Sequence, residues 1–231
     1  MADITISGPD GKMGAYVALP KDRAKAPGIL VIQEIFGVNK VMRSLTDGFA
    51  AEGYVALCPD LFWRQQPGIQ LTDQSEAEWK RAFELYQGFN EAKGVGDLIV
   101  SLGHMRGLPQ CNGKVGTVGY CLGGKLAYLM ATRSNADANV GYYGVGIDKA
   151  LGEAAAITKP LMLHIAAKDK FCPPEAQAEI IGTLARNSHA TLHSYPDADH
   201  AFARVGGEHY DKSAADIANR RTAEFFKKHL G

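Results

Sequence analysis

Residues 113–125 read GKVGTVGYCLGGK, and the interpretation of the whole chain starts from this stretch. Residues 114–119 predict a buried strand, and residues 122–132 predict a helix with one apolar side. Between them, Gly119-Tyr120-Cys121-Leu122-Gly123 has the spacing of a nucleophile elbow, with cysteine where serine is usual. Such a turn exposes its central side chain at a helix N-terminus, which favours a thiolate and a developing oxyanion.

The alternative for this stretch is a glycine-rich turn that carries a buried structural cysteine. A five-residue pattern occurs by chance often enough that it does not decide between the two. A nucleophilic Cys121 also needs a base, and the base needs a carboxylate that orients it, so the rest of the chain has to supply both.

Composition and charge restrict the class of protein. The chain has 231 residues, 46% hydrophobic and 22% charged, with 25 basic residues against 25 acidic ones. This predicts one folded domain over residues 1–231, and zero net charge argues against nucleic acid or an anionic membrane as partner. The chain shows no signal-peptide pattern and no apolar run of about 18 residues, so we expect a cytoplasmic protein.

The four cysteines show neither a CxxC pair nor zinc-like spacing with histidine. We therefore expect reduced thiols, of which Cys58, Cys111 and Cys172 are structural, and no metal or organic cofactor.

Strand and helix patterns alternate along the chain. Strands are predicted at residues 4–6, 13–19, 27–33, 54–58, 114–119, 139–143, 161–166 and 190–195. Helices are predicted at residues 38–52, 75–90, 96–106, 122–132, 174–187 and 210–230, with an exposed connection at 20–26 and a loop at 60–71. The apolar run at 27–33 indicates a strand buried on both faces. The alternation indicates an α/β fold, a doubly wound, mostly parallel sheet with helices on both faces.

One histidine stands out among seven as a candidate base. Only His200 lies in a loop directly beyond a strand, where sites collect in open α/β sheets. Asp169 holds the same position after the strand at 161–166, and the order nucleophile, acid, histidine is that of elbow-bearing hydrolases. The other acids in this part of the chain remain rivals: Asp148, Asp197 and Asp199.

A second cluster of candidates follows the apolar run at 27–33. Glu34 ends this strand, where a carboxylate either faces a pocket or is an exposed strand-end acid or a charge near a helix N-cap. The backbone N–H groups of Ile35 and Leu122 are the candidate oxyanion donors. Arg204, four residues after His200, either holds a substrate anion bidentately or is a solvated arginine.

Six stretches give the chain a specific family resemblance. They are VIQEIFGVN at residues 31–39, CPDLFWRQQPG at 58–68, AKGVGDL at 92–98, NGKVGTVGYCLGG at 112–124, VGYYGVG at 140–146 and HAFAR at 200–204. In this order, over nearly the whole chain, they resemble the dienelactone hydrolases (carboxymethylenebutenolidases), cysteine members of the α/β-hydrolase group.

The resemblance implies an α/β-hydrolase fold with Cys121, Asp169 and His200 as catalytic triad. It also implies that Glu34 contacts the thiol and that Arg204 holds a substrate carboxylate. The implied reaction is hydrolysis of an enol-lactone such as dienelactone to maleylacetate, in bacterial breakdown of chlorinated aromatics. Further substrate contacts are expected from four aromatic side chains and one arginine: Trp79, Arg81, Phe83, Tyr86 and Tyr143.

Two positions depart from the family pattern. A second carboxylate-binding arginine is expected where this chain has Trp79, and Arg81 is displaced from that place by two residues, or about half a helical turn. Ala201 replaces a hydroxyl residue after the histidine. Both departures concern the substrate and leave the hydrolytic residues intact.

We therefore expect an enzyme that opens a small lactone or ester through a Cys121 thioester. The alternatives are a general ester or thioester hydrolase of the same fold, and a non-catalytic binding protein on a hydrolase scaffold. The expected partner is a small molecule. The sequence leaves the oligomeric state open, and a monomer is compatible with it.

Overall fold

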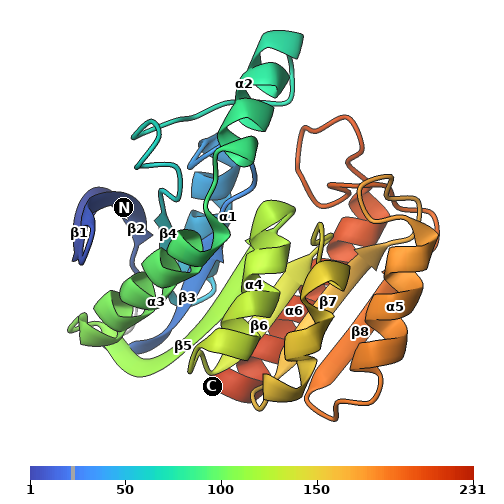
Figure 1. The fold of residues 1–231 in the computed structure, drawn as a ribbon. Helices are drawn as coiled ribbons and strands as arrows, with labels where there is room; N and C mark the ends of the chain where they lie inside the picture. Colours follow the sequence, from blue (N-terminus) through green and yellow to red (C-terminus); the bar gives the residue numbers. More distant parts are fainter. Residues whose placement is uncertain (22–23) are drawn as a thin grey trace. The chain divides into compact units, whose positions relative to one another are not determined.

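The computed structural model describes residues 1–21 and 24–231, which form two compact units, Met1–Val115 and Gly116–Gly231 (Figure 1). The boundary between the units falls inside strand β5 (Cys111–Tyr120). The single domain expected over the whole chain stays a prediction. The predicted connection at residues 20–26 includes residues 22–23, which lie outside the described residues.

The strands of the first unit are neighbours in the order β1-β2-β4-β3. β1 (Ala2–Gly8) and β2 (Gly11–Ala18) form an antiparallel hairpin, and β2 is also antiparallel to β4 (Val55–Pro59). β3 (Ala26–Ile32) runs parallel to β4 and is buried along its whole length. This confirms the doubly buried strand that the apolar run predicts.

Three helices of the first unit begin after a polar capping residue. These are α1 (Lys40–Ala51), α2 (Glu76–Gln87) and α3 (Glu91–Gly107). The cap side chains of Asn39, Ser75 and Asn90 each accept a hydrogen bond from the backbone N–H three residues on. α1 and α3 pack on β3 and β4, whereas the buried residues of α2 are Ala82 and Leu85.

The strands of the second unit are all parallel and have the order β5-β6-β7-β8. β6 (Ala138–Tyr142), β7 (Leu161–Ala166) and β8 (Ala190–Tyr195) follow β5 in that order along the chain. Because the strands are parallel, the loops that follow them emerge at one edge of this part of the sheet.

Helices lie on both faces of these strands. α4 (Leu122–Arg133), the 3₁₀ helix η1 (Asp148–Ala156) and α5 (Pro174–Leu184) lie on one side, and α6 (Lys212–Leu230) lies on the other (Figure 1). The glycines of β5 reflect the two helix layers, since a Cβ on Gly116 would press on Phe226 of α6.

Two strands, Leu161–Ala166 and Ala190–Tyr195, have the predicted bounds, and the other predicted elements exist with shifted ends. The largest error concerns α3, which begins at Glu91 rather than at residue 96. α5 ends at Leu184 rather than at 187, and the 3₁₀ helix was not predicted. Within residues 1–21 and 24–231, no helix has both the length and the apolar character needed to cross a bilayer.

Candidate active site

The predicted elbow is present as a strained turn between β5 and α4. Cys121 has φ 55° and ψ −114°, a left-handed conformation that side-chain-bearing residues rarely adopt. The turn is held by backbone hydrogen bonds, because the Cys121 N–H donates to the Tyr142 carbonyl at 3.1 Å and the Cys121 carbonyl accepts from the Gly124 N–H at 2.9 Å. The thiol is buried, and the next residue, Leu122, starts α4 with an N–H that has no intrahelical acceptor.

The glycines around the elbow are required by the close approach of α4 to the strands. A Cβ on Gly119 would overlap the carbonyl of Gly123 in the first turn of α4. A Cβ on Gly124 would overlap the Tyr142 carbonyl at the end of β6, and one on Gly141 would press on the Gly124 carbonyl. The sequence GYCLGG therefore matches the local geometry residue by residue.

Asp169 and His200 come together at the edge where β7 and β8 end. The Asp169 Oδ2 lies 2.7 Å from the His200 Nδ1, and the two residues are 3% and 6% exposed. The second carboxylate oxygen, Oδ1, accepts from the Phe171 N–H at 2.8 Å, so Asp169 is held from both sides. This contact fixes which ring nitrogen of His200 faces the carboxylate and leaves Nε2 for another partner.

The rival acids are engaged elsewhere. Asp197 pairs with Lys168 at 3.0 Å, and Asp199 Oδ1 accepts from the backbone N–H of His200 at 2.7 Å rather than from its ring. Asp148 begins η1. Among the four acids considered from the sequence, Asp169 is the one whose carboxylate hydrogen-bonds the His200 ring.

His200 is electrostatically coupled to both neighbours. Burial alone would lower its pKa, but the charge of Cys121 and hydrogen bonds with Asp169 and Cys121 outweigh burial and raise the pKa of His200 to about 10. This pKa favours a protonated imidazole at neutral pH when Cys121 carries a negative charge. The arrangement can hold a thiolate–imidazolium pair with a carboxylate behind it.

Aromatic side chains enclose the histidine. The rings of Phe171 and Tyr143 meet the His200 ring edge to face, at centroid distances of 4.9 and 5.2 Å. Tyr143 has φ 38° and Ala201 has φ 63°, and together with Cys121 they are the non-glycine residues of the described chain with positive φ. The strained non-glycine backbone positions of the described residues therefore lie at Cys121 and next to His200. The contact of Phe171 was not predicted, although its position two residues after Asp169 is a usable signal.

Two of the other three thiols have raised pKa values. Burial is the main cause that raises the pKa of Cys58, and burial together with the charge of Asp169 raises the pKa of Cys172 to about 11. Cys111 is buried at the start of β5. His164 is buried in β7, where its ring nitrogens meet the hydroxyls of Tyr195 and Thr222 at 2.8 and 3.0 Å.

Arg204 is not a solvated arginine. The residue is 7% exposed, in the loop that follows His200. The backbone N–H of Arg204 donates to the Ala201 carbonyl at 2.9 Å, and the Arg204 carbonyl accepts from the Gly207 N–H at 3.0 Å. The loop therefore forms a compact turn. A buried guanidinium with a fixed backbone is suited to hold an anion.

Within the first unit, Glu34 and Ile35 directly follow β3. Glu34 is 1% exposed, which excludes the exposed strand-end acid considered from the sequence. Its carbonyl accepts from the side-chain amide of Gln33 at 3.1 Å, while the Gln33 oxygen accepts from the Leu61 N–H at 3.0 Å. Gln33 therefore fixes the backbone that carries Glu34.

The predicted substrate residues of α2 form an aromatic cluster with one engaged arginine. Trp79 stacks on Phe83 at 5.5 Å and meets Phe36 edge to face at 5.0 Å. Arg81 pairs with Glu84 at 2.9 Å and donates to Gln66 at 2.7 Å, so it is occupied within the first unit. Phe83 and Tyr86 are each 38% exposed.

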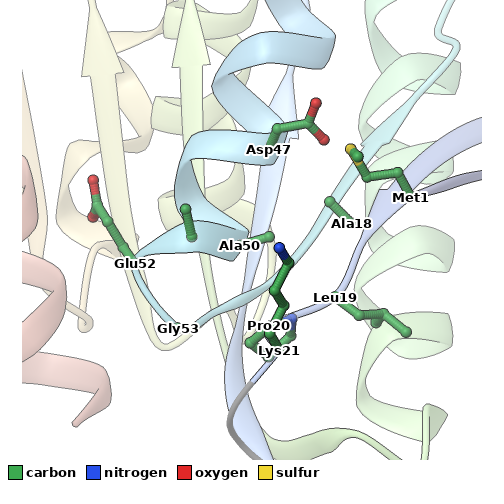
Figure 2. A pocket seen from close by; sticks show the side chains of 10 residues that line it. Met1, Ala18, Leu19, Pro20, Lys21, Asp47, Ala50, Glu52 and Gly53 are labelled. Atoms are coloured by element: carbon green, nitrogen blue, oxygen red, sulfur yellow. The ribbon is translucent and has the colours of Figure 1, made fainter.

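The first unit contains a cavity that no predicted site residue lines. A cavity of about 480 Å³ lies between the end of β2 and the end of α1, lined among others by Met1, Lys21, Asp47 and Glu52 (Figure 2). The carboxylate of Glu52 points away from Met1 in this view. The cavity offers no arrangement of nucleophile, base and acid.

Comparisons with known proteins point to one family. Residues 13–230 match the model of the dienelactone hydrolase family. A provisionally named carboxymethylenebutenolidase of Azospirillum brasilense is 51% identical over the full length of both chains. The carboxymethylenebutenolidase of Pseudomonas putida is 42% identical, covering 96% of this chain and 94% of that protein.

A solved structure confirms the predicted α/β-hydrolase fold. The crystal structure of a provisionally named dienelactone hydrolase from Klebsiella pneumoniae has a TM-score of 0.86 at 27% identity and covers 98% of both chains. A family match over most of the chain and relatives above 40% identity lead to one conclusion. The chain belongs to the dienelactone hydrolase family, a family of hydrolases.

Proposed function

We propose that this protein hydrolyses a small carboxylated enol-lactone, such as dienelactone, through a Cys121 thioester. The position of His200 is the observation that carries the proposal. Its ring is hydrogen-bonded to the buried carboxylate of Asp169 at 2.7 Å and to the side chain of Cys121. A nucleophile, a proton carrier and an orienting acid in this relation are the parts that acyl transfer requires.

In the first step the Cys121 thiolate attacks the lactone carbonyl. The bond between sulfur and the carbonyl carbon forms, the ring carbon–oxygen bond breaks, and the departing enolate oxygen takes the proton of His200. The pKa of His200, raised to about 10, supports a starting state in which this proton is present at neutral pH. Because the substrate is cyclic, the leaving group stays attached to the acyl chain.

In the second step neutral His200 takes a proton from water. The water oxygen attacks the thioester carbonyl, the carbon–sulfur bond breaks, and the thiolate returns with protonated His200 beside it. The products are a carboxylic acid and an enol that tautomerises to a ketone, which for dienelactone gives maleylacetate. Asp169 keeps its charge throughout and stabilises the imidazolium.

Both steps pass through an oxyanion. We propose that the N–H groups of Leu122 and Ile35 bind it, Leu122 because it starts α4 and Ile35 because it follows β3. We further propose that Glu34 acts on the thiol when substrate binds. Its near-complete burial supports a role other than a surface charge.

The substrate class rests on Arg204 and on the relatives. The Pseudomonas putida relative is named for opening carboxymethylenebutenolide, a lactone with a carboxylate arm. We propose that Arg204 holds the equivalent carboxylate, while Trp79 and Phe83, with Tyr86 and Tyr143, contact the flat conjugated part of the substrate. Arg81 is a weaker candidate, because Glu84 and Gln66 already bind it.

One observation favours a second candidate function, a general hydrolase of small neutral esters. The α2 position where a second cationic contact is expected holds Trp79, part of an aromatic cluster with Phe36 and Phe83. An apolar wall of this kind suits an uncharged acyl group as well as a conjugated lactone.

A substrate panel tests the proposal. Acid release would be measured by pH-stat for dienelactone, a neutral enol-lactone of the same ring size and p-nitrophenyl acetate, with Cys121→Ala as control. The proposal predicts the highest kcat/KM for dienelactone and no turnover by Cys121→Ala. A higher kcat/KM for the neutral compounds would favour the general esterase, and no turnover of any compound would indicate a binding protein.

A further inference from the structure

The second unit contains a cavity that none of the proposed catalytic residues lines. It has a volume of about 520 Å³ and lies between the first part of β8 and the C-terminal half of α6. Its charged and titratable lining consists of His189, His193, Arg221, Glu224, Lys228 and His229. This site does not depend on the proposed reaction.

The lining follows from the periods of its two elements. Arg221, Glu224, Phe225 and Lys228 stand at i, i+3, i+4 and i+7 of α6, which places them on one face of the helix. His193 belongs to β8, in register with His164 of β7, and His189 precedes that strand. The cavity is therefore built into the regular structure rather than formed by a loose loop.

The cavity lining holds two cationic side chains, Arg221 and Lys228, and one carboxylate, Glu224. Arg221 and Lys228 make no ion pair with a carboxylate among the residues that the structure describes, and Glu224 makes none either. On the same helix Lys212 and Asp216 do pair, at 2.6 Å and at the i, i+4 spacing that Glu224 and Lys228 share. Two cations therefore stand beside one unpaired carboxylate.

The histidines add hydrogen-bonding capacity to this charge. Burial and then the neighbouring Arg221 lower the pKa of His193, and burial and then Lys228 lower the pKa of His229. Both rings are therefore largely neutral at pH 7.5 and can donate to an anion. An anion between the basic groups would also relieve the mutual repulsion that lowers these pKa values.

One wall of the cavity is apolar. Met162 of β7 and Phe225 of α6 both line it, and both are largely buried. The ring of Phe225 meets the ring of His229 edge to face at 4.6 Å. A ligand that fits this lining combines a flat apolar body with acidic groups.

We propose that this cavity binds a small organic dianion, with its acidic group held by Arg221 and Lys228 and its apolar body on Phe225 and Met162. The two cations attract a doubly charged ligand more strongly than a monoanion, and Glu224 opposes part of that attraction. The guanidinium of Arg221 is planar, and the ammonium group of Lys228 is a mobile point charge. Together the two groups suit a phosphate monoester or a dicarboxylate.

Half-buried Arg221 also contacts a buried hydrogen-bond network. It donates to the Tyr195 hydroxyl at 3.2 Å, and that hydroxyl meets His164 Nδ1 at 2.8 Å. A variant at Arg221 therefore changes this network as well as the cavity, whereas exposed Lys228 touches the cavity alone. Lys228→Gln is the cleaner test, and Arg221→Gln supports it.

The chain offers a matched control for each variant. Lys227 and Arg220 are exposed neighbours of the same charge on the same helix, and neither lines the cavity. Binding of phenyl phosphate at pH 7.5 and low salt would be measured by calorimetry for wild type, Lys228→Gln, Lys227→Gln, Arg221→Gln and Arg220→Gln. Inorganic phosphate and phenol serve as probes of the acidic group and of the apolar body alone.

We expect phenyl phosphate to bind wild type with a Kd below about 1 mM and more tightly than either partial probe. Lys228→Gln should weaken binding about threefold to tenfold and Arg221→Gln about tenfold or more, as expected for charged hydrogen bonds, while both controls stay within about twofold. Absence of binding to wild type, or equal weakening in Lys228→Gln and Lys227→Gln, would overturn the proposal. Thermal unfolding of each variant verifies that it is folded.

Discussion

Replacing Asp169 by asparagine isolates the charge behind His200. The substitution keeps the size of the side chain and its acceptor for the Phe171 N–H, but it removes the charge 2.7 Å from His200 Nδ1. Both residues are buried, so solvent cannot replace the lost partner. Removing one member of such a buried pair costs about 3–5 kcal/mol, or roughly a hundredfold to several thousandfold in rate.

We therefore predict that Asp169→Asn lowers kcat by about that factor with a much smaller effect on KM, because the imidazolium is no longer stabilised. The assay is steady-state hydrolysis of the best substrate of the panel. Asp197→Asn is the matched control, since this exposed acid sits near His200 in sequence and pairs only with Lys168 on the surface. A kcat for Asp169→Asn within about threefold of wild type, in a variant that remains folded, would refute the reasoning.

Three other predictions concern the thiols, the substrate anion and the elbow. With a substrate analogue bound, iodoacetamide at pH 7.5 should label Cys121 first, because a pKa of about 11 leaves fewer than about one in a thousand Cys172 side chains as thiolate. Peptide mapping measures which cysteine is labelled. Preferential labelling of Cys172 with activity retained would contradict the prediction. Arg204→Ala should raise KM for dienelactone about 10- to 150-fold and leave KM for a neutral ester nearly unchanged. Trp79→Arg should raise the ratio of kcat/KM for the carboxylated substrate to kcat/KM for the neutral one. An unchanged ratio in both variants would show that neither residue faces the substrate. Gly119→Ala should lower the free energy of unfolding by more than about 3 kcal/mol in chemical denaturation, because the added Cβ overlaps the Gly123 carbonyl. Gly152→Ala is the control and should cost little, because the space around Gly152 is open. Similar losses in both variants would show that the elbow tolerates a side chain.

Much of the second unit can be predicted from the sequence because its strands have clear local limits. Leu161–Ala166 is preceded by Pro160, and Ala190–Tyr195 is followed by Pro196, so both strands are bounded by turn residues. The elbow is predictable for a different reason, namely that the close packing of α4 allows no side chain at Gly119. Each of these is a local constraint that leaves a mark in the sequence.

The two main errors have different causes. Gly94 and Gly96 suggest a break before α3, yet the helix begins at Glu91 because Asn90 caps it and the ring of Phe89 fills the space beside Gly94, which are both local features. Residues 148–156, rich in alanine, carry no clear period, and their 3₁₀ helix is supported by contacts with α4 and α5. Local propensity contains no information about those contacts.

The order of the site residues and the pairing of Asp169 with His200 could be predicted, but the residues alone left rival aspartates. Several aspartates follow strands in this half of the chain, and only the folded backbone brings Asp169 to the ring of His200 while Lys168 takes Asp197. The burial of Arg204 and the edge-to-face contact of Phe171 likewise depend on how two loops pack against each other. The substrate contacts proposed on α2 rest on the family resemblance alone.

The central claim is a covalent thioester on Cys121, and trapping that intermediate tests it most directly. Enzyme mixed with excess of a slowly hydrolysed aromatic ester would be quenched in acid within milliseconds and mapped by mass spectrometry after proteolysis. We predict one acyl group, on the peptide that contains Cys121, which disappears at the rate of turnover and is absent in Cys121→Ala. An acyl group on another residue, or full turnover with no acylated peptide at any time, would contradict the account.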